Sequence, residues 1–184
     1  TRDCAFPPPG MAPAHAGRVE VDRVPLRVIR DTYATYSAIA MDQRTGEVMM
    51  EDENLFGIKV FNRTDNTPPT AAFTEPKRTI SGPQTKLEFN CGLYVDPVSG
   101  DVYSVNNDTT DNMVVFPYGA QGDRPPAREL HVPHGSYGIA VNEKAQEMYI
   151  TVEHINSVVV FPKMAKGEDK PIRTLGGTKT QQEN

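Results

Sequence analysis

Residues Ser136–Phe161 read SYGIAVNEKAQEMYITVEHINSVVVF, and this stretch decides the fold. It contains an apolar run, a polar turn, an alternating segment, a second turn and another apolar run, and the echo PIRTL follows at Pro171–Leu175. The same order occurs earlier in Leu93–Phe116 (LYVDPVSGDVYSVNNDTTDNMVVF) and Ile39–Phe61 (IAMDQRTGEVMMEDENLFGIKVF). Such self-similarity indicates a repeat architecture, which takes precedence over other interpretations of the chain.

Each repeat predicts an inner strand, a return strand and a third strand. The inner strand is apolar on both faces, as expected for a strand buried between neighbouring sheets. It ends in Asp or Asn, and two of the three turns that follow end in Gly, whereas the third has Gln146 at that position, which we expect to weaken the turn. A phenylalanine ends every third strand and is expected to fill the gap between sheets. The predicted strands are 39–42, 47–50 and 58–61, then 93–96, 101–104 and 113–116, then 139–142, 147–150 and 158–161.

A fourth, outer strand is predicted by the motif Pro-x-Arg-x-aliphatic. It occurs at Pro25–Ile29, Pro76–Ile80, Pro126–Leu130 and Pro171–Leu175, with starts 51, 50 and 45 residues apart. A proline that opens a strand fits an edge position, because it lacks the N–H that a central strand donates. We expect the arginine of each copy to point outward to solvent and the aliphatic residue to point inward.

Four antiparallel strands in a unit of about 50 residues are typical of a β-propeller blade. A β-sandwich has no reason to repeat its side chains in register, and a parallel β-helix has a much shorter period. We therefore predict an all-β propeller of four-stranded antiparallel blades, about three of which are present. The expected organisation is an extended, Pro-rich arm at 1–24, an outer strand at 25–31, and blades at about 36–82, 90–133 and 136–177.

The units resemble the NHL-type six-bladed propeller family. The resemblance rests on Gly138–Asn142 (GIAVN), Gly100–Val105 (GDVYSV) and Asn156–Phe161 (NSVVVF), and it extends from about Pro25 to Leu175. It implies that the three blades belong to a six-bladed ring. Three blades cannot close a ring, because the faces of the first and last would stay apolar and exposed. We expect either that the chain is a fragment or that a protein partner or a second copy completes the ring.

Composition limits the classes of partner. Among 184 residues, Lys and Arg total 19 and Asp and Glu total 24, which gives a net charge of −5. This balance argues against nucleic acid as a main partner, since phosphate binding requires a basic face. No apolar run approaches the roughly 20 residues of a membrane helix, so no membrane span is expected. The sequence begins at Thr1 without an apolar leader, which we interpret as a processed form or a fragment.

The two cysteines, Cys4 and Cys91, leave two interpretations open. They are either separate buried thiols or a disulfide that joins the N-terminal arm to the body, which requires an oxidising compartment. Glycosylation-type triplets begin at Asn62 and Asn107, both in predicted turns. These features favour an extracellular or cell-envelope location.

Ligands of propellers are expected at the mouth of the central channel. Residues near the starts of the inner strands are Ser37, Asn90, Cys91 and Tyr137, with His134 just upstream of the last strand. The loops between return and third strands contribute Glu53, Glu153 and His154. These eight residues are the candidate ligand-binding residues.

The middle loop is rich in oxygen ligands and contains Asn107, Asp108 and Asp111. These residues are candidate Ca²⁺ ligands, because Ca²⁺ takes about six to eight oxygens, although the same residue types are ordinary in exposed hairpin loops. The four histidines occur in no established metal-binding spacing. We retain His134 and His154 as candidates because both fall near predicted loops.

Two function classes follow from this pattern. No Gly-x-Ser-x-Gly motif and no phosphate-binding glycine loop is present. We therefore predict a non-enzymatic, extracellular interaction or structural propeller that presents loops or open blade edges to protein partners. The alternative is a metal-dependent propeller lyase or hydrolase, as the family resemblance implies, and this would require His and carboxylate side chains to converge at the channel mouth.

Overall fold

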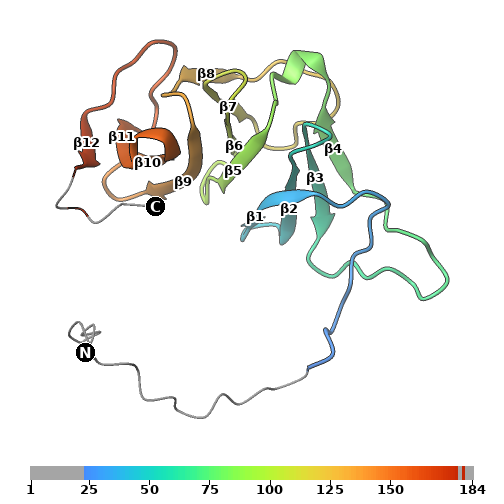
Figure 1. Ribbon diagram of the computed structural model, residues 1–184. Coiled ribbons are helices and arrows are strands. Elements are labelled where there is room, and N and C mark those ends of the chain that lie inside the picture. The colour runs from blue at the N-terminus through green and yellow to red at the C-terminus, as the bar shows by residue number, and fades with distance from the viewer. Residues whose placement is uncertain (1–22, 178–179, 181–184) are drawn as a thin grey trace, which may run out of the picture.

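Three four-stranded antiparallel sheets lie side by side along the chain (Figure 1). This computed structural model describes residues 23–177 and 180, so Cys4, His15 and most of the expected arm lie outside the described residues. Within that part of the chain, helical structure is confined to the three-residue 3-10 turns η1 (Pro83–Thr85) and η2 (Glu153–Ile155), and no helix there could cross a membrane. The predicted all-β blade architecture is confirmed.

Each sheet is one blade, and its strands follow in chain order from the inner to the outer edge. Blade 1 contains β1 (Tyr36–Asp42), β2 (Glu47–Asp52), β3 (Gly57–Asn62) and β4 (Arg78–Ser81). Blade 2 contains β5 (Asn90–Val95), β6 (Val102–Asn106), β7 (Asn112–Phe116) and β8 (Arg128–His131). Blade 3 contains β9 (Ser136–Asn142), β10 (Glu147–Val152), β11 (Ser157–Pro162) and β12 (Arg173–Gly176).

The turns between inner and return strands share one backbone conformation. Gly46, Gly100 and Gln146 have φ of 74°, 79° and 55°, all in the left-handed region. Glycine adopts this region without steric cost, whereas glutamine does not. Gln146 therefore carries strain at a position where the other two blades use glycine.

The core lies between the blades. Phe61, Phe116 and Phe161, which end the third strands, are almost fully buried, as their repetition predicts. One apolar cluster joins blades 1 and 2 through residues such as Met49, Ile58, Val102 and Val114, and a second joins blades 2 and 3 through Val105, Met113, Met148 and Ile150. Packing between sheets thus holds the three blades together.

The outward face of blade 1 remains exposed. Ile39 and Met41 of β1 are 68% and 47% exposed, although the sequence predicts an inner strand buried on both faces. They pair in register with Met50 and Val48 of β2, so these four apolar side chains share one face of the sheet. Burial on both faces fails for this strand because no described blade packs against blade 1, as expected for the first blade of an incomplete ring.

Two of the arginines of the Pro-x-Arg motif, Arg78 and Arg128, do not point to solvent as predicted, whereas Arg27 and Arg173 are exposed. The guanidinium of Arg78 donates two hydrogen bonds, of 2.7 Å each, to the two carboxylate oxygens of Glu47, and only 9% of its side chain is exposed. Arg128 lies over the ring of Tyr103 at 5.0 Å. The prediction was wrong because these long side chains fold back across the sheet to a partner on the return strand.

Residues 25–31 were expected to form an outer strand, and they form none. The carbonyls of Val28 and Arg30 instead accept hydrogen bonds from the N–H groups of Thr67 and Thr74, at 2.8 and 2.9 Å. All three described sheets already have a fourth strand, so this segment has no equivalent edge to complete. It packs along the loop that follows β3.

Candidate functional site

The sequence-predicted ligand residues lie at one end of the blades. The start of each inner strand pairs with the end of its return strand, as in Tyr36–Asp52, Asn90–Asn106 and Ser136–Val152. The β2–β3, β6–β7 and β10–β11 loops therefore lie next to the segments that lead into β1, β5 and β9. Side chains from neighbouring blades can meet at this loop end, as well as within the core and at the opposite turns.

Two histidines and an aspartate meet between blades 2 and 3. Nε2 of His134 and Nε2 of His154 lie 3.9 and 3.7 Å from Oδ1 of Asp108. The two imidazole rings are stacked, with centroids 5.1 Å apart and planes inclined by 10°. One ligand atom from each residue lies within 4.8 Å of the other two, and all three residues are exposed.

Backbone hydrogen bonds hold the loops that carry the histidines. The N–H of Glu153 donates to the carbonyl of Gly135 at 2.9 Å, which ties the segment before β9 to the β10–β11 loop. The ring of His154 packs against Gly135, where a Cβ would lie 2.2 Å from Cδ2 of the imidazole. Gly135 has a φ of 76°, so both its backbone and its missing side chain are needed to place His154.

The oxygen-rich loop supplies two of its three predicted metal ligands to this cluster. Oδ1 of Asp111 lies 2.9 Å from Nδ1 of His134, and Asp108 faces both histidines. Oδ1 of the third residue, Asn107, is buried without a hydrogen-bond partner. The sequence placed the aspartates and the histidines in separate groups, and the structure brings them together.

Tyr137 senses the charge of two acidic residues from the same loop end of the blades. Tyr137 is partly exposed, and its pKa is raised by partial burial and further by the negative charges of Glu53 and Glu153. Its hydroxyl therefore stays protonated at neutral pH. The loop end of the blades has an acidic character, which favours cationic ligands.

The remaining predicted residues lie deeper. The hydroxyl of Ser37 donates to the carbonyl of Asn90 at 2.7 Å, which links blades 1 and 2. Asn90 and Cys91 are buried, and burial raises the pKa of the Cys91 thiol to about 12, so the thiol stays protonated. Since Cys4 lies outside the described residues, a disulfide with Cys91 stays a prediction.

Glu51 is a buried titratable residue that the sequence analysis missed. Its Oε1 accepts a 2.5 Å hydrogen bond from the hydroxyl of Ser104 across the interface of blades 1 and 2. Its Oε2 has no partner, and neither does the nearby Oδ1 of Asn90. Burial raises the pKa of Glu51 to about 8, against the smaller lowering effects of Ser104 and of the Asn90 side chain. The alternation of Glu51 with the core residue Met49 on β2 was the available signal.

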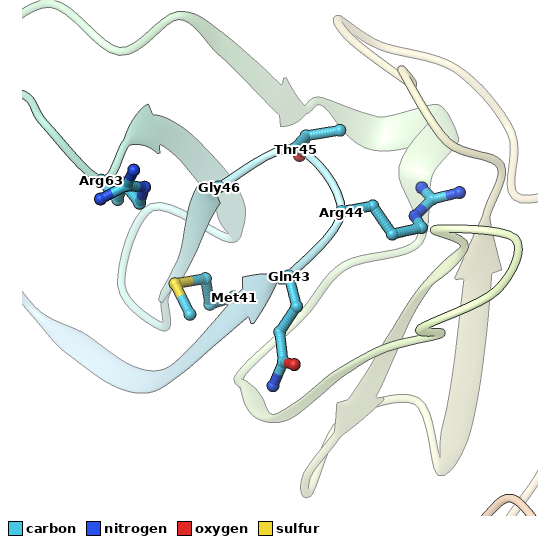
Figure 2. A pocket seen from close by; sticks show the side chains of 6 residues that line it. All are labelled: Met41, Gln43, Arg44, Thr45, Gly46 and Arg63. Atoms are coloured by element: carbon cyan, nitrogen blue, oxygen red, sulfur yellow. The ribbon is translucent and has the colours of Figure 1, made fainter.

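An open depression of about 380 Å³ lies at the opposite end of blade 1, around the β1–β2 turn (Figure 2). In Figure 2, Arg44 extends away from Met41 and Arg63. Its guanidinium donates to the carbonyl of Val98 at 2.7 Å and pairs with Asp42 at 3.0 Å. Its charge is therefore already used to join blades 1 and 2, and the depression offers no comparable group of converging ligands.

Comparison with solved structures supports the architecture. The chain is similar to Kuenenia stuttgartiensis hydrazine synthase (TM-score 0.56, 12% identity), covering 80% of this chain and 38% of that one. It is also similar to a candidate 6-phosphogluconolactonase from Bacteroides fragilis (TM-score 0.58, 8% identity, 76% of this chain and 38% of that one). The fold is a β-propeller.

This propeller segment also resembles a functionally unknown protein from Desulfotomaculum acetoxidans, with a TM-score of 0.56 and 10% identity over 77% of this chain and 42% of that one. The chain thus spans less than half the length of these three structures. Identity at this level establishes the fold alone. No protein-family model matches the sequence, and no curated protein does.

Proposed function

We propose that this chain is a non-enzymatic interaction propeller whose open blade 1 face binds a further blade, supplied by a second copy or by a protein partner. The exposed pair Ile39 and Met41 is the observation that carries the proposal. The two other faces of comparable composition, between blades 1 and 2 and between blades 2 and 3, are each covered by a neighbouring sheet. Because the outward face of blade 1 has the same side-chain pattern, it favours the same kind of cover, a neighbouring four-stranded sheet.

Burial of apolar surface would drive the binding of a further blade. Complete burial of an aliphatic side chain of this size stabilises by about 1.5–3 kcal/mol. Ile39 and Met41 share their face with the half-buried Val48 and Met50, so a partner blade would cover a contiguous apolar surface. Contiguous apolar surfaces of this kind mark interaction sites more often than free surface.

We also propose the type of propeller and its cellular location. The repeat motifs favour the NHL type of propeller and a ring of six blades. The triplet at Asn62, whose side chain is exposed, supports an extracellular or cell-envelope location. Peptide mapping of the natural protein for an N-linked glycan at Asn62 tests the location.

The interaction is tested by light scattering of the purified chain and of the variants Ile39→Lys and Met41→Lys. The unsubstituted chain is expected to exceed the monomer mass of 20.3 kDa, and each variant is expected to shift the mass towards the monomer. Val98→Lys is the matched control, because Val98 is exposed in a turn of blade 2, away from the open face. A well-folded, unsubstituted monomer would overturn the second-copy form of the proposal, and a monomer that also fails to bind any protein through position 39 would overturn the partner form.

A metal-dependent lyase or hydrolase is the second candidate function. It is favoured by the convergence of Asp108, His134 and His154 at the loop end. The test is chelator-sensitive hydrolysis of p-nitrophenyl esters by the unsubstituted chain and by His134→Ala. Equal rates for the two proteins, or rates indifferent to chelator, would remove hydrolysis of these esters from consideration.

A further inference from the structure

We propose that Asp108, His134 and His154 form a binding site for a divalent transition metal of the Zn²⁺ type, and that the bound ion joins blades 2 and 3. Asp108 comes from the β6–β7 loop of blade 2, His154 from the β10–β11 loop of blade 3, and His134 from the segment between the blades. The site is independent of any partner on blade 1.

The two histidine–aspartate distances fit such an ion after a contraction of a few tenths of an ångström. Zn²⁺ binds imidazole nitrogen and carboxylate oxygen at about 2.0–2.2 Å, which in tetrahedral geometry places two ligand atoms about 3.4 Å apart. Oδ1 of Asp108 lies 3.9 Å from Nε2 of His134 and 3.7 Å from Nε2 of His154. The histidine ligand atoms are bounded only by 4.8 Å and the two rings are stacked, so the exposed imidazoles must also rotate about their side-chain torsions to direct both lone pairs at one ion.

Asp111 gives His134 the orientation of a metal ligand. Its carboxylate lies 2.9 Å from Nδ1 of His134, so Nδ1 carries a proton and donates it in this hydrogen bond. In the neutral imidazole, Nε2 then presents a lone pair, and this nitrogen is the one that faces Asp108. A carboxylate behind a histidine is the usual second partner of a metal-bound imidazole.

The arrangement calls for a cation at its centre. When the imidazoles are neutral, the lone pair of His134 and the carboxylate of Asp108 face each other as two acceptors, an arrangement that suits a shared cation. A metal ion satisfies both at once, and protonation of the imidazoles is the competing solution. Measuring metal binding at a pH above the ordinary pKa of histidine distinguishes metal binding from protonation, because free imidazoles are neutral there.

The donor set selects the metal. Two imidazoles and one carboxylate suit Zn²⁺, Co²⁺ or Ni²⁺, whereas Ca²⁺ requires about six to eight oxygens. We propose this mixed nitrogen and oxygen site in preference to the Ca²⁺ site predicted from Asn107, Asp108 and Asp111. Three protein ligands leave one tetrahedral position open to water or to an anionic ligand, and the side chains of the three residues are 54–60% exposed.

The test is zinc binding to the full chain after removal of metal with EDTA, measured at pH 7.5 by competition with a chromogenic chelator. We expect one Zn²⁺ per chain, a higher melting temperature with zinc, and no competition from millimolar Ca²⁺. His134→Ala, His154→Ala and Asp108→Ala should each weaken binding at least tenfold. Asp111→Asn should weaken it about tenfold while keeping the stoichiometry at one, since it only positions His134.

His131→Ala and His15→Ala are the controls, because His131 lies on β8 outside the cluster and His15 precedes the described residues. Circular dichroism of each metal-free variant verifies that it folds. Absence of zinc binding to the unsubstituted chain would overturn the proposal. The same holds if His134→Ala and His154→Ala bind zinc as tightly as the two controls, which would place the ion elsewhere.

Discussion

Replacing Glu51 by glutamine should stabilise the protein increasingly as the pH rises. The carboxyl group is buried, with one oxygen bonded to Ser104 and the other without a partner. Burial raises its pKa in the folded state to about 8, from an ordinary value of 4.5. Between these values the folded state holds a proton that the unfolded state has released, so the free energy of unfolding falls as the pH rises through this window.

The magnitude follows from this window. One pH unit within it changes the free energy of unfolding by about 1.4 kcal/mol, so the step from pH 5 to pH 8 costs the unsubstituted protein roughly 3 kcal/mol. Glutamine cannot ionise. Its Oε1 can accept from Ser104, and its amide can donate to an acceptor such as Oδ1 of Asn90, which has no partner. We therefore expect near-equal stability at pH 5 and an advantage of roughly 3 kcal/mol for Glu51→Gln at pH 8.

Urea unfolding followed by circular dichroism at pH 5, 6.5 and 8 measures this difference. Glu168→Gln is the matched control, because Glu168 is a highly exposed glutamate in the loop before β12, and its stability should follow the unsubstituted protein at every pH. A difference between Glu51→Gln and the unsubstituted protein that does not change with pH would refute the reasoning. An unsubstituted protein that is the more stable one at pH 8 would refute it as well.

Three further predictions concern single side chains. Gln146→Gly should raise the free energy of unfolding by about 0.5–1 kcal/mol, measured by urea unfolding, because Gln146 has a φ of 55°. Gly135→Ala should lower zinc affinity about tenfold in the chelator assay by displacing His154, and unchanged affinity would contradict the role of His154. Asp96→Asn should lower the free energy of unfolding by about 2 kcal/mol at pH 7. Burial raises the pKa of Asp96, but the 2.6 Å ion pair with Lys163 and hydrogen bonds from backbone N–H groups outweigh burial and lower this pKa to about 2. This cost should disappear as the pH falls from 4 to 2, and a cost independent of pH would argue against the ion pair.

The strand pattern could be predicted because the repeats constrain one another. Each inner and return strand lies where the alignment of the three units places it, and the recurring phenylalanines are buried as expected. Outer strands begin at the arginine of the Pro-x-Arg motif, two residues later than predicted, as at Arg78. The exposure of Ile39 could not be predicted from its own repeat, because it depends on which blade lacks a neighbour.

The candidate site could be predicted only in part. His134 and His154 were selected by their place in loops, and Asp108 by the composition of its loop. Their meeting depends on the lateral packing of blades 2 and 3, which no local pattern encodes. Equivalent loops of consecutive blades do lie side by side in a propeller, so alignment of the repeats was the signal that could have joined Asp108 to His154. The identity of the metal follows from side-chain geometry and lies beyond sequence patterns.

The most direct measurement of the open blade face is photo-crosslinking from position 39. A photoreactive side chain in place of Ile39, with the same group in place of Val98 as the control, reports what covers each position. We expect an efficient crosslink from position 39 to a strand of a second copy or of a partner protein, and no crosslink to another chain from position 98. Equal, background-level crosslinking from both positions would contradict the central claim that blade 1 binds a further blade.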